Sequence, residues 1–413
     1  MRAWRNCNKT VPSGTVPANS APVAPALPVM APTGAVNSPE RQRRRKGPGR
    51  RRAAASILFS LLLVTALLVP TGYLTQKAGP ALAVTEEYNG NQLVQISDVK
   101  TYESDTDFLL TTVSATGSAD QGVLGGTALL AAVDPAIQLL PVRMIYPANV
   151  TSQQVKKQNE QLMDSSQNVA DLVALETAGF PVSMKVVITA AAKDSSAAKV
   201  VETGDVITGL TTPAGSADIK TFAQMSKILN NTPPGTDISL RVLRDGKELT
   251  LPITTRPYQP DESGWTHPGS LLGVLVKVED VKLPAQVKYL IDGIGGPSAG
   301  TIFALSIYDA VTAGSLGGDS RIAGTGALNW SGDVTPIGGV QHKMRGAVRA
   351  GAADFIAPAA NCRDVVGNVP AGLTVWAVRN FSEAIAAATA IGEGDASARV
   401  SCEAVISEID SQE

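Results

Sequence analysis

The sequence has few of the side chains on which most metal and redox centres depend. Its 413 residues include two histidines and three cysteines. No Cys/His spacing typical of a zinc site is present, because His267 and His342 are the only histidines. A Gly-x4-Gly-Lys-Ser/Thr motif is also missing, which excludes a P-loop ATPase within these residues. We therefore expect neither a metal nor a cofactor.

Charge is sparse as well, and it is distributed unevenly. The net charge is −2, yet residues 1–52 hold eleven Lys or Arg and one Glu. A basic start followed by an acidic remainder is typical of a tail and a body that lie in different environments. The length suggests two or three domains.

Residues 1–40 contain seven prolines and little hydrophobic periodicity, which predicts disorder. A basic run, RQRRRKGPGRRR, follows at 41–52. Such a run can bind nucleic acid, but it directly precedes the uncharged stretch 53–74. We favour a topogenic flank and expect no nucleic-acid partner. The expected organisation begins with a disordered basic cytoplasmic tail over 1–52.

The stretch 53–74 reads AAASILFSLLLVTALLVPTGYL and carries no charge. As a helix it would be about 33 Å long, enough to cross a bilayer. The basic N-terminal flank predicts that this end stays in the cytoplasm and that the body lies outside it, at the cell membrane. The alternative is a cleaved signal peptide, because Ala81-Leu82-Ala83 resembles a cleavage site. We favour an uncleaved, single-pass anchor.

Cysteine usage agrees with an extracytoplasmic body. Cys7 lies in the tail, whereas Cys362 and Cys402 are the two cysteines of the exported part. A lone pair in an oxidising compartment indicates a disulfide. Two unpaired buried thiols remain the alternative.

The most informative stretch is GGPSAG at 295–300, which precedes a helical pattern of apolar residues. Ser298 is therefore expected near a helix N-terminus, where unpaired N–H groups could stabilise an oxyanion. Small neighbours such as Gly296 leave room for a substrate backbone. A serine needs a base in reach, and Lys343 in TPIGGVQHKMRGA is the candidate.

Together these motifs resemble the proteolytic domain of Lon-type serine proteases of peptidase family S16. The resemblance rests on GPSAG, on Thr325-Gly326 and on PIGGV-x-x-K, and it covers about 271–391. It implies a Ser298–Lys343 dyad with Thr325 beside the lysine. It also suggests a homo-oligomer, since Lon relatives commonly form hexameric rings. One departure is Gly295, where Lon proteins usually have an aspartate.

The middle of the chain resembles a PDZ domain, mainly over 179–257. GDVITG at 204–209 matches a PDZ strand, TFAQMSKIL at 221–229 predicts a helix, and an Asp-Gly turn joins two further strands. PDZ domains bind an extended peptide as an added strand and hold its terminal carboxylate on backbone N–H groups. Gly179 and Phe180 are the candidate carboxylate loop, with an ordinary turn as the alternative.

We expect an α+β fold: an N-terminal transmembrane helix and a Lon-type α/β proteolytic domain with an inserted, β-rich PDZ-like domain. The expected segments are an N-terminal protease part at 85–165, the PDZ-like domain at 166–257, the main proteolytic part at 268–391 and a C-terminal tail at 392–413. Strands are expected within 88–150, with a loop or short segment at 135–147, and a long helix at 151–178. Residues 271–278, mostly apolar, predict a buried protease strand, and the tail is expected to be mobile except at Cys402.

The expected function is an ATP-independent, membrane-anchored serine endopeptidase acting on unfolded, short or membrane-associated polypeptides. Gly-x-Ser-x-Gly also fits the nucleophile elbow of α/β-hydrolases, but that fold needs an acid and then a histidine after the serine. Only His342 follows, and adjacent helix residues point about 100° apart, so it cannot share the direction of Lys343. A non-catalytic, PDZ-bearing membrane scaffold remains the second possibility.

Overall fold

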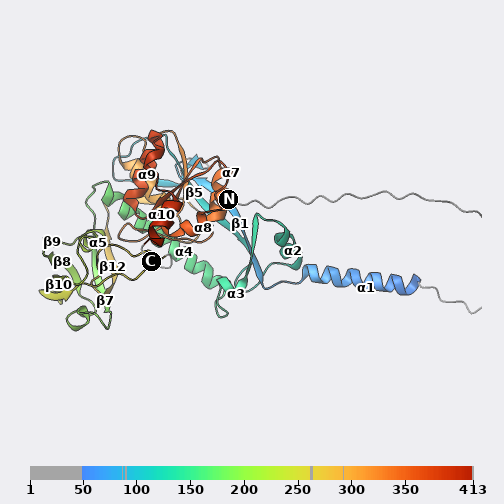
Figure 1. Ribbon diagram of the computed structural model, residues 1–413, viewed down its shortest axis with the longest axis horizontal. Coiled ribbons are helices and arrows are strands. Elements are labelled where there is room, and N and C mark those ends of the chain that lie inside the picture. The colour runs from blue at the N-terminus through green and yellow to red at the C-terminus, as the bar shows by residue number, and fades with distance from the viewer. Residues whose placement is uncertain (1–48, 86, 89–90, 261–263, 292, 412–413) are drawn as a thin grey trace, which may run out of the picture. The chain divides into compact units, whose positions relative to one another are not determined.

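The computed structural model describes residues 49–85, 87–88, 91–260, 264–291 and 293–411. The predictions on the tail at 1–40 and on most of the basic run lie outside these residues. The chain divides into two compact units, Met1–Phe59 and Ser60–Glu413, with the boundary inside the first helix. The fold is a mixed α+β one, and Figure 1 labels many of its elements.

Helix α1 spans Gly49–Leu68, has no buried residue, and is long and apolar enough to cross a membrane. It ends earlier than the predicted 74. Pro70 follows, and a proline disfavours the helical conformation in the residue before it. Leu74 is instead buried in strand β1, Tyr73–Ala83. The sequence 81–83, considered above as a cleavage site, lies inside this strand.

One six-stranded sheet has the order β18-β17-β14-β5-β1-β6. Strands β5, β14, β17 and β18 run parallel, and β1 is antiparallel to both β5 and β6. The strands are β5 Asp107–Thr116, β6 Ile137–Pro141, β14 Arg321–Gly324, β17 Asp354–Pro358 and β18 Thr374–Val378.

Helices cover both faces of this sheet. Side chains alternate between the two faces along each strand, and their contacts show which helices cover which face. Phe108 and Leu110 belong to one buried cluster, with residues of α4, α6 and α9. Leu109 between them belongs to a second cluster, with residues of α7, α8 and α10. The helices are α4 Ser152–Thr177, α6 Gly300–Val311, α7 Val340–Arg349, α8 Cys362–Val365, α9 Phe381–Glu393 and α10 Cys402–Asp410.

A second sheet has the order β11-β10-β8-β7-β12, and β9 pairs with β8. Its strands are β7 Ser183–Ala191, β8 Val206–Thr212, β9 Gly215–Asp218, β10 Asp237–Arg244, β11 Lys247–Thr254 and β12 Val274–Lys282. Helix α5, Phe222–Asn230, lies between β9 and β10 in the sequence. The predicted Asp-Gly turn joins β10 to β11, with both Asp245 and Gly246 at positive φ as this turn requires.

Strand β12 corrects one prediction. We expected 271–278 to be a buried strand of the protease, but β12 pairs antiparallel with β7 at the edge of the second sheet. Residues 274–279 alternate between half-buried and exposed, 280–282 are exposed, and 66% of Leu275 is exposed. An apolar run predicts a strand but does not name its partner, which is set by tertiary contacts.

The N-terminal and C-terminal regions differ from the prediction too. Residues 87–150 contain the strands β2 Glu87–Tyr88, β3 Asn91–Gln92 and β4 Val94–Ser97 besides β5 and β6. They also contain two helices that were not expected, α2 Gly125–Val133 and α3 Val142–Ile145. Helix α4 is continuous across residue 165, where one segment was expected to end. The C-terminal tail is not a mobile segment, because α10 buries Val405 and Ile409. The remaining strands are β13 Gln286–Tyr289, paired with β4, β15 Ala327–Leu328 and β16 Val334–Thr335.

Candidate active site

The turn that carries Ser298 is held by α4. The N–H of Gly296 donates to the carbonyl of Asn159 at 3.0 Å, and the hydroxyl of Ser166 donates to the carbonyl of Pro297 at 2.9 Å. A Cβ at Gly300 would lie 2.9 Å from Ser166 Oγ, so the close approach of α6 to α4 requires glycine there. Ser298 is therefore presented at the start of α6 by a neighbouring helix rather than by its own turn alone.

Lys343 approaches from the other face of the sheet. Helix α7, which carries it, begins after Gly339 at φ 72°, a conformation that favours glycine. The side chain of Lys343 is buried, and its Nζ lies 2.6 Å from Ser298 Oγ and 2.9 Å from Thr325 Oγ1. Because α6 and α7 lie on opposite faces, the two residues meet beyond the end of β14.

Thr325 stands at that meeting point, directly after β14. Its hydroxyl donates to the carbonyl of Ser298 at 3.0 Å. A hydroxyl has one proton, so Thr325 must accept from an N–H of Lys343. A neutral amine held in this way directs its lone pair elsewhere, and Ser298 Oγ is the nearest partner.

Burial determines the pKa of Lys343. Removal from water disfavours the ammonium form and lowers the pKa of Lys343 from 10.5 to about 7. Among the described residues, no carboxylate forms a salt bridge with Lys343 to oppose this effect. A substantial share of the amine is thus neutral near pH 7.

Two backbone N–H groups at the serine are candidate donors to a substrate. Within the described part of the chain, the N–H groups of Ser298 and Ala299 donate to no backbone oxygen. Both precede α6, whose helix dipole favours negative charge at this end. The bond from Ser166 to the Pro297 carbonyl fixes the peptide plane to which the N–H of Ser298 belongs, since a trans peptide directs the two groups oppositely. These donors could therefore bind an oxyanion.

Ser166 and the carbonyl of Asn159 were missed by the sequence analysis. Ser166 is buried on α4 along with Met163, Val169 and Ala170. A single small polar residue at i, i+3 spacing within an apolar helix face was the available signal. Its partner, however, lies 131 residues away and could not be read from that pattern.

The other polar candidates lie apart from the dyad. His342 is buried, and its Nε2 lies 3.1 Å from Oε1 of Gln138 on β6, so it packs rather than joins the site. Burial lowers its pKa. Asp333 lies 3.7 Å from His267. Asp292 lies outside the described residues. No cluster of three potential metal ligands is present among the described residues.

Gly179 and Phe180 do not form the expected carboxylate loop. Gly179 donates to the carbonyl of Glu176 and Phe180 to that of Leu175, with Gly179 at φ 86°. This pattern is a Schellman motif, which ends α4 and uses both N–H groups. The prediction is corrected because helix termination requires the same donors.

A groove lies instead beside α5 and β12, which is the last strand of its sheet. Its cavity volume is about 1060 Å³, and Phe222, Met225 and Leu229 of α5 line it together with 271–278. Much of the remaining lining comes from residues within 256–268 and from the proteolytic part, including 333–336. Gly273, at φ 75°, turns the chain at the start of β12. An apolar helix face opposite an unpaired strand edge is the geometry that accepts an extended peptide.

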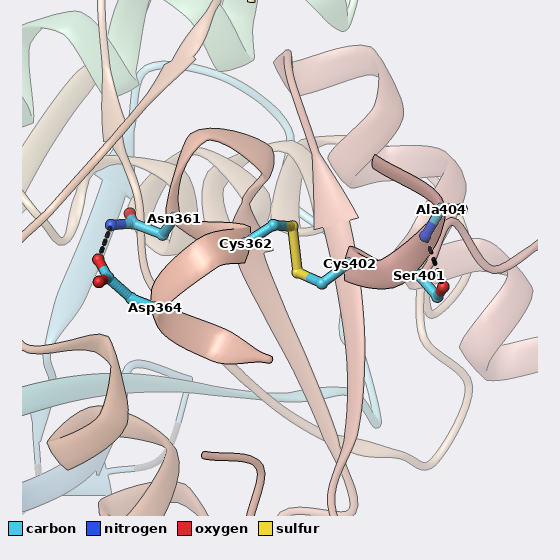
Figure 2. Close-up of a disulfide and its surroundings, with 6 residues drawn as sticks. All are labelled: Asn361, Cys362, Asp364, Ser401, Cys402 and Ala404. Carbon is cyan, nitrogen blue, oxygen red and sulfur yellow. Dashed lines mark hydrogen bonds between the residues drawn. A yellow bond between two sulfur atoms is a disulfide. The ribbon is translucent and has the colours of Figure 1, made fainter. Parts of the chain in front are cut away.

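The structure joins Cys362 and Cys402 in a disulfide. Figure 2 shows that this bond links the start of α8 to the start of α10. The side chain of Ser401 caps α10 by accepting from the N–H of Ala404 (Figure 2). The C-terminal helix is thus fastened at its first turn.

Comparison with known proteins assigns the segment that carries this site. Residues 293–390 match the family model described as the Lon protease (S16) C-terminal proteolytic domain. The chain carries a Lon-type proteolytic domain. Lon protease 2 of Herpetosiphon aurantiacus is 41% identical over 93 residues, covering 22% of this chain and 11% of that protein. Lon protease 2 of Bacillus subtilis is 35% identical over 92 residues, covering 22% and 16%.

An archaeal Lon protease from Methanothermobacter thermautotrophicus is 27% identical over 146 residues, covering 31% of this chain and 22% of its own. The chain thus covers 11–22% of the length of these three relatives. Among solved structures, the PDZ domain of an SdrC-like protein from Listeria innocua covers 22% of this chain and 92% of its own, with 18% identity and a TM-score of 0.18.

Proposed function

We propose that this chain is a membrane-anchored serine endopeptidase that acts without ATP, with Ser298 as nucleophile and Lys343 as general base. The observation that carries the proposal is the 2.6 Å contact between Ser298 Oγ and a buried lysine whose pKa is lowered to about 7. A lysine with an ordinary pKa would be protonated and could not accept a proton. The Lon-type match over 293–390 supports the same chemistry.

The mechanism follows from the contacts. Neutral Lys343, oriented by Thr325, takes the hydroxyl proton as Ser298 Oγ attacks a peptide carbonyl. The N–H groups of Ser298 and Ala299 would stabilise the resulting oxyanion. The lysine then returns the proton to the leaving amine, and water hydrolyses the acyl-enzyme. Gly296 leaves open space beside the serine for a substrate backbone.

The anchor is proposed to be α1, kept in the mature protein with its basic flank in the cytoplasm. Retention is supported by β1, since cleavage after Ala83 would remove the strand that pairs with both β5 and β6. Losing an interior strand of the sheet would expose two strand edges and the core beneath them. The body would then lie outside the cytoplasm, consistent with its disulfide.

Substrates are proposed to be unfolded, short or membrane-associated polypeptides, because these 413 residues contain no P-loop to drive unfolding. The PDZ-like segment would present their ends, bound along β12 and α5. Assembly into a homo-oligomeric ring, as a hexamer, rests on the Lon resemblance alone.

A non-catalytic, PDZ-bearing scaffold is the competing function. The test is to incubate the purified full chain, reconstituted in nanodiscs, with an unfolded protein and no nucleotide. Cleavage is expected, and both Ser298→Ala and Lys343→Ala should abolish it. Intact substrate with the unsubstituted chain, or equal cleavage by all three proteins, would favour the scaffold or reveal a contaminant.

A further inference from the structure

Helix α2 exposes an unusually apolar surface. Ala131 is its one buried residue, while Leu129, Leu130 and Val133 are 60%, 69% and 75% exposed. Residues 121–133, QGVLGGTALLAAV, contain no charge. A surface helix of a soluble protein normally directs polar side chains outward, and a contiguous apolar patch marks a binding surface.

The start of α2 is fastened to the end of α1. The N–H of Gly125 donates to the carbonyl of Val69 at 3.0 Å, and Leu124 forms a β-bridge with Pro70. A Cβ at Gly125 would lie 2.0 Å from the carbonyl oxygen of Ala66, so this approach is possible only for glycine. The first residue of α2 is thus held against the last turn of the candidate membrane span.

The neighbouring surface has the same character. Helix α3, which contacts the same strand β6 as α2, exposes 71% of Met144 and 40% of Ile145. Tyr73, five residues beyond the end of α1, is 44% exposed. An aromatic residue with a polar end suits the boundary between acyl chains and headgroups.

We propose that α2 lies in the bilayer leaflet at which α1 ends, with Leu129, Leu130 and Val133 in the acyl region. This inference rests on the proposed membrane anchoring by α1. We expect lipid, rather than a second copy of the chain, to cover the apolar face of α2, because α2 begins beside the end of the candidate span α1. A nine-residue helix is about 13 Å long, and its apolar face alone is smaller than the roughly 800 Å² that each partner of a stable protein interface buries.

A second membrane contact would change what the anchor does. A single helix leaves the attached body free to rotate and tilt about one point. With α2 also seated in the leaflet, strands β1 and β6 would be held at a fixed distance from the lipid surface, because α2 contacts both. The enzyme would then act on segments that lie close to the membrane.

The test uses the full chain with Cys7→Ser, so that one introduced thiol can carry an environment-sensitive fluorophore. The labelled variants are Leu130→Cys on α2, Leu62→Cys in α1, and Lys247→Cys at the exposed β10–β11 turn. Each is reconstituted in nanodiscs of phosphatidylcholine and phosphatidylglycerol, with and without lipids brominated along the acyl chains.

Bromine should quench the probe at position 130 at least twofold, most strongly when it is placed near the headgroup. Position 62 should be quenched and position 247 should not. Quenching at 62 without quenching at 130 would overturn the role of α2 while leaving the anchor intact. A blue-shifted but unquenched probe at 130 would mean that protein covers the face. No quenching at 62 would refute membrane anchoring, and the proposal for α2 would fall with it.

Discussion

The proton-accepting role that we propose for Lys343 makes a quantitative prediction about pH. A pKa of about 7 means that roughly a tenth of the amine is neutral at pH 6 and roughly nine-tenths at pH 8. The kcat/KM for a short fluorogenic peptide should therefore rise about tenfold between these values and then level off. With an ordinary lysine pKa the rise would be about a hundredfold and would continue toward pH 10.

The substitutions follow from the same contacts. Lys343→Met keeps the length and the burial but offers no base, and Lys343→Arg stays charged, so both should reduce activity to the level of Ser298→Ala. Combining Lys343→Met with Ser298→Ala should add almost nothing, because the pair acts as one unit. His342→Gln serves as the neighbouring control and should leave the pH midpoint unchanged.

Stability supplies an independent check that needs no substrate. The folded-state pKa of Lys343 lies below the unfolded value of 10.5, so the unfolded chain binds more protons between about pH 7 and 10.5. Stability therefore rises with pH across this window. The cost of burying a neutral amine at pH 7 is of the order of 5 kcal/mol, and Lys343→Met should recover part of it in denaturant titrations. An unfolding free energy that does not change between about pH 7 and 10.5, or a kcat/KM that keeps rising beyond about pH 9, would refute the lowered pKa of Lys343.

Three further predictions concern residues around the site and the fold. Ser166→Ala should lower kcat about tenfold with little change in KM or in the pH midpoint, since it loosens the peptide that carries an oxyanion donor; Ser306→Ala, which removes a comparable buried bond to a helix carbonyl, should not. Burial raises the pKa of Asp171 to about 7, so the folded state keeps a proton that the unfolded state has lost above pH 4, and stability falls as pH rises from about 4 to 7. The cost of this shift above pH 7 is of the order of 4 kcal/mol, and Asp171→Asn should recover part of it at pH 8 in urea titrations, whereas an unchanged midpoint would place the proton elsewhere. Replacing Cys362 and Cys402 by serine should cost about 4 kcal/mol of unfolding free energy and open α10 to proteolysis; an unchanged cleavage pattern would mean that packing alone holds it.

Local chemistry explains what the sequence alone determined. The long helix expected at 151–178 is observed as α4, which begins at Ser152, and the structure shows a complete capping box at Thr151. The Asp-Gly pair specifies a hairpin because few residues tolerate its two positive φ angles. Ser298 and Lys343 were named from their motifs, and the structure brings their side chains together. In each case the signal lies within a few residues of the feature.

Tertiary structure decided the features that depend on distant partners. The mostly apolar run at 271–278 predicts a strand, but only the pairing of β12 with β7 places it in the second sheet. In the sequence, Gly179 fits either a ligand loop or a helix end; in the structure the carbonyls of Glu176 and Leu175 accept from the N–H groups of Gly179 and Phe180, which makes it a helix end. The pKa of Lys343 likewise depends on burial between layers that come together from residues far apart in sequence. Hydrophobic periodicity in the sequence indicates that one face of a helix or strand is buried, but only the folded chain shows which element packs against that face.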